Sequence, residues 1–494
     1  MKRTLIILAI LFGSTVIAAA QSPVTALEQR LRIIVQRSQA LGGAAVGVSV
    51  RDMSGAEVAG LNSAQRMVPA SNMKLITTGT ALHTLGAEYR FKTSIGYTGA
   101  IDGGTLNGDL YIIGGGDPTT AVDNMEEVFA SWKSILDGAG ISRIQGRIIG
   151  DQRAWEGFLE LGDWTYEDVG TYYGTGAGAL NFYKNAIDLK VAAGEAEGAP
   201  VQAVQAFPQT PWMHSANSSL TGPEGTGNSL YLYTTDLAPY AELRGSFALD
   251  RAPKTEHFAN KFGALTCAYY FRKYLSGNGI SVTGNAADID RGGYIREADF
   301  TLGEKAGEPK IIGGSRSVRL GDIVRETNFE SDNFYAEAIF RTMGEEATGC
   351  AVYDSSGVAE KSALKSLGLR TEDLTIMDGS GLSRRNAVSA GLMTRYLNAM
   401  ACSPAFPSFL QSLPMPGEGT LSSLLKDRPG AARYRLKSGS MEGVLCYSGY
   451  LLADDGTPLA SVSVLVNGTN AGTAKVRKAL EDVLRAIAEN LLSL

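Results

Sequence analysis

The stretch that decides the fold is Met67-Val-Pro-Ala-Ser71-Asn-Met-Lys74-Leu-Ile-Thr-Thr78. Pro69 suits the start of a helix, because its fixed φ angle matches the first helical turn, and the apolar run to Leu85 continues that helix. Ser71 and Lys74 lie three residues apart, so their side chains share one helix face. A serine hydroxyl can be activated by a neutral lysine as well as by a histidine. The stretch therefore predicts a nucleophile and its base at the start of a helix.

Two later motifs complete an ordered set with this stretch. Ser331-Asp332-Asn333 follows it, and Lys437-Ser438-Gly439 is the one Lys-Ser/Thr-Gly sequence in the chain. S-x-x-K alone has little specificity: it recurs at Ser362/Lys365 and Ser423/Lys426, which we predict to be solvated helix positions. The order of the three motifs is that of penicillin-binding proteins and serine β-lactamases. The set therefore predicts that distant segments meet in one cleft.

The pattern around the motifs predicts an α/β fold. Hydrophobic periodicity predicts helices and strands on both sides of a long middle segment, 93–254, in which short β-like runs alternate with glycine-rich turns. We expect helices at 24–40, 258–275, 320–342, 358–367 and 473–492, and strands at 44–51, 56–61, 434–452 and 459–466. The middle segment is interpreted as an insert of one or two small β-rich modules. The third motif begins the last β-pair, so we expect it on an edge strand beside the nucleophile.

The first twenty residues are typical of a signal peptide. Lys2 and Arg3 precede an apolar run, and Ala18-Ala19-Ala20 supplies the small residues that a signal peptidase requires. We expect cleavage after Ala20 and export to a periplasmic or other extracytoplasmic compartment; an uncleaved membrane anchor is the alternative. At the other end, the apolar face of 473–492 is predicted to pack on the preceding sheet, with contact to a membrane surface as the alternative.

Composition excludes several classes of protein. Of the 494 residues, 44% are hydrophobic and 19% charged, a balance typical of a globular chain and not of a disordered one. The net charge of −6 argues against a generally basic nucleic-acid binder. The three histidines show no metal-binding spacing, so neither a metal nor another cofactor is predicted. Disulfides and buried free thiols are both open for the four cysteines, Cys267, Cys350, Cys402 and Cys446.

The sequence resembles the low-molecular-mass penicillin-binding proteins of the D-alanyl-D-alanine carboxypeptidase/endopeptidase type that carry a large insert after the first motif. The resemblance covers nearly the whole chain after residue 20. Besides the three motifs, it rests on stretches at 108–111, 116–118, 146–151, 164–181, 378–384 and 413–420. One departure is Ser438, where the family usually has threonine, so the hydroxyl is kept and a methyl group is lost. The family residue is not assumed at Glu442, which could affect substrate choice.

The resemblance implies a penicillin-binding/β-lactamase-like transpeptidase domain formed by 21–92 and 255–494, an antiparallel sheet flanked by helices, with 93–254 inserted. It also implies a serine hydrolase that cuts peptidoglycan stem peptides through an acyl-enzyme and is acylated by β-lactam antibiotics. The implied catalytic residues are Ser71 as nucleophile, Lys74 as base, Ser331 as proton relay, Asn333 as a holder of the substrate amide, and Lys437. The implied substrate-binding residues are Ser438, Gly439, Ser440, Asp168 and Arg384.

Within that set, Lys437 and the Ser438 hydroxyl would meet the terminal carboxylate of the substrate. The backbone N–H groups of Ser71 and Ser440 would form an oxyanion hole. Asp168 and Arg384 are candidates to grip the diamino acid of the stem peptide, with ordinary surface ion pairing as the alternative. The sequence does not distinguish carboxypeptidase from endopeptidase activity, and it indicates no oligomeric state. A β-lactamase, or a non-catalytic peptidoglycan-binding protein on the same fold, is the alternative function.

Overall fold

The computed structural model describes residues 25–426 and 433–492; the predicted signal peptide lies outside these ranges. A five-stranded sheet in the order β2-β1-β26-β25-β24 joins the two ends of the chain, and all its neighbouring strands are antiparallel. Its strands are β1 (Ala45–Asp52), β2 (Glu57–Leu61), β24 (Tyr434–Met441), β25 (Val444–Leu452) and β26 (Pro458–Asn467). The third motif therefore lies on the edge strand β24, as predicted.

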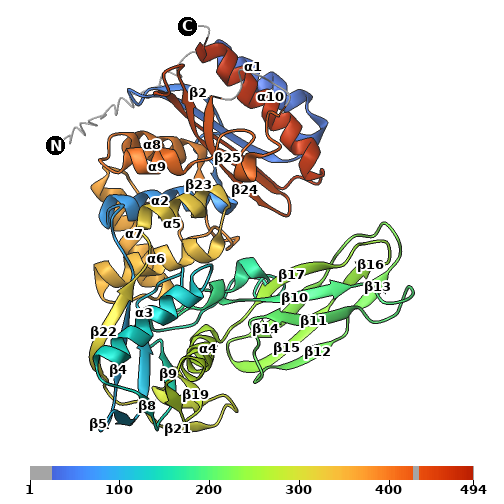
Figure 1. Cartoon of the computed structure of the whole chain (residues 1–494). Helices are drawn as coiled ribbons and strands as arrows, with labels where there is room; N and C mark the ends of the chain where they lie inside the picture. Colours follow the sequence, from blue (N-terminus) through green and yellow to red (C-terminus); the bar gives the residue numbers. More distant parts are fainter. Residues whose placement is uncertain (1–24, 427–432, 493–494) are drawn as a thin grey trace, which may run out of the picture.

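Helices cover both faces of this sheet. Helices α1 (Ala26–Arg37) and α10 (Thr473–Leu492) lie on one face, and α8 (Ala390–Ala401) lies on the other (Figure 1). The apolar side chains of α10, among them Val476, Leu480 and Val483, are buried with those of α1 and the sheet. The prediction that this helix packs on the sheet is therefore confirmed. Within the described ranges, we find no helix with the length and apolar character needed to cross a membrane.

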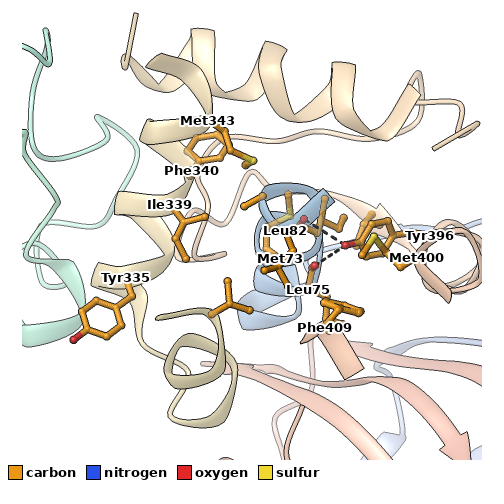
Figure 2. Close-up of a cluster of buried hydrophobic side chains, with 14 of the residues drawn as sticks. Met73, Leu75, Leu82, Tyr335, Ile339, Phe340, Met343, Tyr396, Met400 and Phe409 are labelled. Carbon is orange, nitrogen blue, oxygen red and sulfur yellow. Dashed lines mark hydrogen bonds between the residues drawn. The ribbon is translucent and has the colours of Figure 1, made fainter. Parts of the chain in front are cut away.

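A helical layer under the sheet encloses the first motif. Helix α2 (Met73–Thr84) is buried almost throughout by the surrounding helices, with α6 on one side and α8 and α9 on the other (Figure 2). The other helices of this layer are α5 (Leu320–Phe329), α6 (Asn333–Thr348), α7 (Tyr353–Ser366) and α9 (Phe406–Ser412). Because α2 is surrounded by packed side chains, the residues at its start are held in fixed positions.

The inserted part of the chain contains two groups of sheets. The first is a seven-stranded sheet in the order β21-β20-β19-β9-β7-β4-β22, together with a four-stranded sheet in the order β18-β8-β6-β5. Helices α3 (Met125–Gly138) and α4 (Gly263–Gly277) pack against these sheets. The strands are β4 (Lys92–Tyr97), β5 (Ala100–Asp102), β6 (Thr105–Asn107), β7 (Leu110–Ile113), β8 (Arg143–Ile144), β9 (Ile148–Asp151), β18 (Ser281–Val282), β19 (Ala286–Ile289), β20 (Tyr294–Glu297), β21 (Leu302–Lys305) and β22 (Lys310–Arg316).

The second group is a β-rich lobe with a small core of its own, drawn in green in Figure 1. It contains the sheets β11-β10-β17, β12-β15-β14 and β13-β16. Its strands are β10 (Ala186–Ala192), β11 (Gln202–Phe207), β12 (His214–Asn217), β13 (Leu220–Gly222), β14 (Tyr231–Thr235), β15 (Ala238–Arg244), β16 (Ser246–Ala248) and β17 (Lys254–Ala259). The fold class predicted from the sequence, α/β with a mostly β two-module insert, is confirmed.

The strand pairing favours an insert that ends later than the predicted 93–254. Strand β22 pairs with β4 along its length, and β19 pairs with β9, so residues after 254 complete the sheets of the insert. The chain thus leaves and returns to the helical layer through two hydrogen-bonded neighbouring strands. We propose that the insert extends from about Lys92 to Arg316.

Several predicted elements have different bounds in the structure; the predicted helix 358–367, for example, is α7 and begins at Tyr353. The predicted helix 320–342 is two helices, α5 and α6, because Ser331 adopts a left-handed conformation (φ 62°) between them. The predicted helix 258–275 begins only at Gly263, after strand β17. The segment 434–452 is two strands, since Gly443 (φ 71°) supplies a tight turn.

All four cysteines are free thiols.

A buried glycine gives a test of the packing around α2. A Cβ at Gly79 would overlap the hydroxyl oxygen of Tyr396, which donates to the Leu75 carbonyl at 2.7 Å (Figure 2). We expect Gly79→Ala to lower the free energy of unfolding by about 2 kcal/mol, because the inserted methyl group displaces this ring. Gly138→Ala is the control, since a Cβ there meets no other atom within 4 Å. Denaturant unfolding that gives equal stability for the two variants would contradict the packing.

Candidate active site

Ser71 lies in η2 (Ala70–Asn72), the short turn that leads into α2, and close backbone packing holds that turn. Ala70 is left-handed (φ 46°), a conformation that costs free energy and needs support from its neighbours. A Cβ at Gly439 would lie 2.6 Å from the Pro69 carbonyl oxygen, so the absence of a side chain lets β24 approach the turn. Gly439, predicted as a substrate-binding residue, thus has an evident packing role beside the nucleophile.

Lys74 is fully buried and its amine meets three oxygen atoms. Nζ donates to Ser71 Oγ at 2.9 Å, to Asn333 Oδ1 at 2.6 Å and to the Ser380 carbonyl at 2.8 Å. Burial lowers the pKa of Lys74 from 10.5 to about 8, against the opposing influence of nearby carboxylates, of which Glu337 is the largest. A base near Ser71 therefore has a substantial neutral population close to neutral pH.

Two buried carboxylates lie behind this lysine. Glu337 accepts from the backbone N–H of Ser380 at 2.8 Å, and burial raises its pKa to about 8. Asp378 accepts from the backbone of Gly381 and Ser383 and from the indole of Trp164 at 2.9 Å. These bonds fix the loop that carries Ser380, whose carbonyl accepts the hydrogen bond from Lys74 Nζ. The acids thus position the lysine, and each raises its pKa to the extent that it is ionised.

The second motif begins helix α6. Asp332 caps that helix by accepting from the Tyr335 N–H at 2.9 Å, which directs Asn333 inward. Asn333 bridges two parts of the molecule: its oxygen accepts from Lys74, and its Nδ2 donates to the Tyr173 carbonyl of the insert at 2.9 Å. The predicted meeting of the first and second motifs is found, although 259 positions separate Lys74 from Asn333.

Lys437 of the third motif is the second buried amine. Its Nζ donates to Ser331 Oγ at 2.8 Å and to the Ser438 carbonyl at 2.7 Å. Burial, and then the charge of Lys74, hold the pKa of Lys437 well below its usual range. Ser438 donates to Thr420 Oγ1 at 2.8 Å. Two buried amines thus lie directly behind two serine hydroxyls, those of Ser71 and Ser331, which line one cleft.

That cleft has a volume of about 1140 Å³ and is lined by both parts of the chain. The part of the chain outside the insert contributes Ser71, Ser331 and Ser440, and the insert contributes Tyr173 and several other tyrosines. Carboxylates outnumber cations on its walls; they are Asp123, Glu167, Asp168, Glu330, Asp332 and Glu442, against Lys184 and Arg384. A substrate group with an amine is suited to this wall.

The two predicted specificity residues both line the cleft. Asp168 accepts from Thr165 at 2.6 Å and from the Tyr173 hydroxyl at 3.2 Å. Arg384 is exposed and lies 3.8 Å from Glu442, the residue for which no family identity is assumed. The structure records no direct contact between Asp168 and Arg384, so any shared role must come through a bound ligand.

Sequence reasoning missed several residues that build this site. Glu337 lies one helical turn after Asn333, and that spacing on one face was the available signal. Lys184 lies in a strained left-handed turn of the insert and donates to Asp332 at 2.7 Å, a contact without a sequence signal. Ser423, predicted at a solvated helix position, instead lies in a turn after η5 (Gly419–Leu421) and lines a cavity beside Ser71.

The sequence matches a known family profile over almost its whole length. The profile described as "D-Ala-D-Ala carboxypeptidase 3 (S13) family" matches residues 27–490. The chain is 28% identical over 479 residues to a D-alanyl-D-alanine carboxypeptidase from Actinomadura sp. (strain R39), covering 94% of this chain and 85% of that one. It is 23% identical over 431 residues to D-alanyl-D-alanine carboxypeptidase DacB of Haemophilus influenzae, covering 84% and 83% of the two chains.

A solved structure has the same fold. The crystal structure of penicillin binding protein 4 (dacB) from Haemophilus influenzae superimposes with a TM-score of 0.77 at 22% sequence identity. The match covers 93% of this chain and 99% of that one. The agreement thus includes the inserted sheets as well as the five-stranded sheet and its helices.

Proposed function

Because the chain belongs to the D-Ala-D-Ala carboxypeptidase 3 (S13) family, we propose that Ser71 is the nucleophile with which it releases D-alanine from peptidoglycan stem peptides. The protein is a serine-type D-Ala-D-Ala carboxypeptidase. The observation that carries the assignment of Ser71 is its 2.9 Å hydrogen bond with a buried lysine whose pKa is about 8. Of the other S-x-x-K serines in the described chain, Ser362 is exposed on α7 and Ser423 accepts from Arg477, so neither has such a partner.

Acylation follows from this geometry. Neutral Lys74 takes the proton of the Ser71 hydroxyl while Oγ attacks the carbonyl carbon between the two D-alanines. The carbonyl oxygen gains negative charge, which the N–H groups of Ser71 and Ser440 would stabilise at roughly 3 kcal/mol per donor. Both residues line the cleft. Asn333, held between Lys74 and Tyr173, is in a position to bind the substrate amide.

The leaving amine needs a proton when the peptide bond breaks. Ser331 is the candidate donor: its hydroxyl gives a proton to the leaving amine and is reprotonated, through the Lys437 amine that hydrogen-bonds to it at 2.8 Å, by the proton that Lys74 took from Ser71. The departing D-alanine then carries away a neutral amine, and Ser71 holds the remaining peptide as an ester. A water molecule attacks this ester with the same groups acting in reverse, which returns the serine hydroxyl. The β-lactam amide is opened by the same first step, so we propose that β-lactam antibiotics acylate Ser71.

The stem-peptide side chain provides a further part of the proposal. A diamino acid that carries an ammonium and a carboxylate suits Asp168 and Arg384, which lie on the walls of one cleft. Glu442, next to Arg384, adds a negative charge that favours the ammonium end. A cross-linked stem peptide presents the same D-alanyl carbonyl, so endopeptidase action is proposed as a second reaction of this site.

Mass spectrometry of purified muropeptides after incubation with the protein tests these proposals. We expect pentapeptide muropeptides to lose one alanine, and cross-linked dimers to become monomers if the endopeptidase reaction occurs. The Lys2 to Ala20 pattern, outside the described residues, supports action after export. Persistence of the pentapeptides with well-folded protein would contradict the carboxypeptidase role. Persistence of the dimers alone would remove only the endopeptidase role.

A further inference from the structure

A second, smaller cavity opens from the reaction centre toward helix α10. Its volume is about 260 Å³, and Ser71 and Ser331 line it together with Ser438 and Ser440 of strand β24. Ser423, Tyr447 and Arg477 also line it. Because Ser71 and Ser331 also line the larger cleft, a substrate bound across the nucleophile can extend into both spaces.

The two cavities differ in charge. The walls of the larger cleft carry more carboxylates than cations, whereas Arg477 is the single charged residue on the described walls of the smaller one. The other polar groups there are hydroxyls, which serve as donors to an anion. The charge distribution thus favours an amine on one side of Ser71 and a carboxylate on the other.

Hydrogen bonds hold the Arg477 side chain at the wall of the smaller cavity. Its Nη1 donates to Ser423 Oγ at 2.8 Å, and it also hydrogen-bonds to the Tyr447 side chain. Within 25–426 and 433–492, no carboxylate lies within 4.0 Å of its guanidinium. Glu481, one turn further along α10, is engaged by the Leu425 N–H at 2.8 Å. The guanidinium therefore has charge and donors available for a ligand.

We propose that Arg477, oriented by Ser423, forms a carboxylate subsite for the leaving group, beyond the Ser438 hydroxyl. The inference rests on the proposed function, since it assumes that the bond cleaved lies at Ser71. A released D-alanine carries a carboxylate next to its new amine, and so does the D-centre of a cross-linked meso-diamino acid. A leaving amine without an adjacent carboxylate, such as the side-chain amine of a cross-linked lysine, lacks this contact. The subsite therefore selects which terminal residue or cross-link is cut.

Two peptides that differ only at the C-terminus test this selection: an acyl-peptidyl-D-Ala-D-Ala with a free carboxylate, and the same peptide as its C-terminal amide. We expect Arg477→Ala to lower kcat/KM for the free acid about 10-fold, the size of a lost charge-assisted hydrogen bond, and to leave the amide nearly unchanged. Arg477→Lys should recover part of the loss. A higher salt concentration should lower the ratio of kcat/KM for the free acid to kcat/KM for the amide in the wild type, because ions screen the charge of Arg477.

Lys478→Ala is the matched control, because it removes the same charge from the next residue of α10, which is exposed and outside the cavity. It should leave both rates unchanged. Equal losses on acid and amide in Arg477→Ala, or no loss on either, would overturn the subsite while the wild type still releases D-alanine. If the wild type released no D-alanine from the free acid, the proposed function would be overturned and, with it, this inference.

Discussion

Ser71→Ala is expected to abolish covalent labelling by a fluorescent penicillin and to reduce D-alanine release by about 10⁶-fold, as for other serine hydrolases that lose their nucleophile. The acyl-enzyme requires an oxygen at this position, and the remaining residues can only position the substrate. Lys74 would lose the hydrogen-bond partner at 2.9 Å but keep Asn333 and the Ser380 carbonyl, so the fold should persist. Labelling in a gel and D-alanine release measured on the same preparation check both effects.

Ser362→Ala is the control for that experiment. Ser362 also begins an S-x-x-K sequence, but it lies exposed on helix α7, away from the cleft. We expect full labelling of this variant. Stoichiometric labelling of Ser71→Ala would show that another residue is acylated. Rapid turnover of the penicillin by the wild type would favour β-lactamase activity, the alternative raised by the sequence.

The reacting groups could be predicted from the sequence because the chemistry restricts both residue type and spacing. A hydroxyl and an amine three residues apart at a helix start must share a face, which is what Ser71 and Lys74 do. Edge strand β24 was predictable as well, since Lys437-Ser438-Gly439 begins a β-pair close to the C-terminus. The long α10 has a clean apolar face and was predicted with its observed bounds.

Contacts between distant segments could not be predicted in the same way. Lys74 meets Asn333 and the Ser380 carbonyl only because α6 and the 378–386 loop pack around α2. The periodicity of 320–342 is continuous, so the left-handed Ser331 that separates two helices leaves no trace in it. The end that we propose for the insert, near Arg316, also depends on tertiary information, because it follows from the pairing of β22 with β4.

Lys74→Arg is expected to lower the acylation rate by about 10³-fold, within the range of a lost general base. A guanidinium keeps its proton at every pH at which the protein is folded, so it cannot accept the proton of Ser71. In the wild type, burial lowers the pKa of Lys74 to about 8, and about a tenth of the amine is neutral at pH 7. The acylation rate should therefore rise with pH through this value and level off above it, whereas Lys74→Arg should show no such rise.

The carboxylates near Lys74 also predict the direction in which the pH midpoint of acylation shifts when one of them is replaced. Glu337 is the largest influence that raises the lysine pKa, so Glu337→Gln should move the midpoint of acylation below that of the wild type. The amide oxygen can still accept from the Ser380 N–H at 2.8 Å, while the longer bond from the Gly379 N–H at 3.2 Å is lost together with the charge. Stopped-flow acylation by a chromogenic β-lactam across this pH range measures both midpoints. A midpoint that stays fixed in Glu337→Gln and is retained in Lys74→Arg would mean that another group, with Lys437 the first candidate, takes the proton of Ser71.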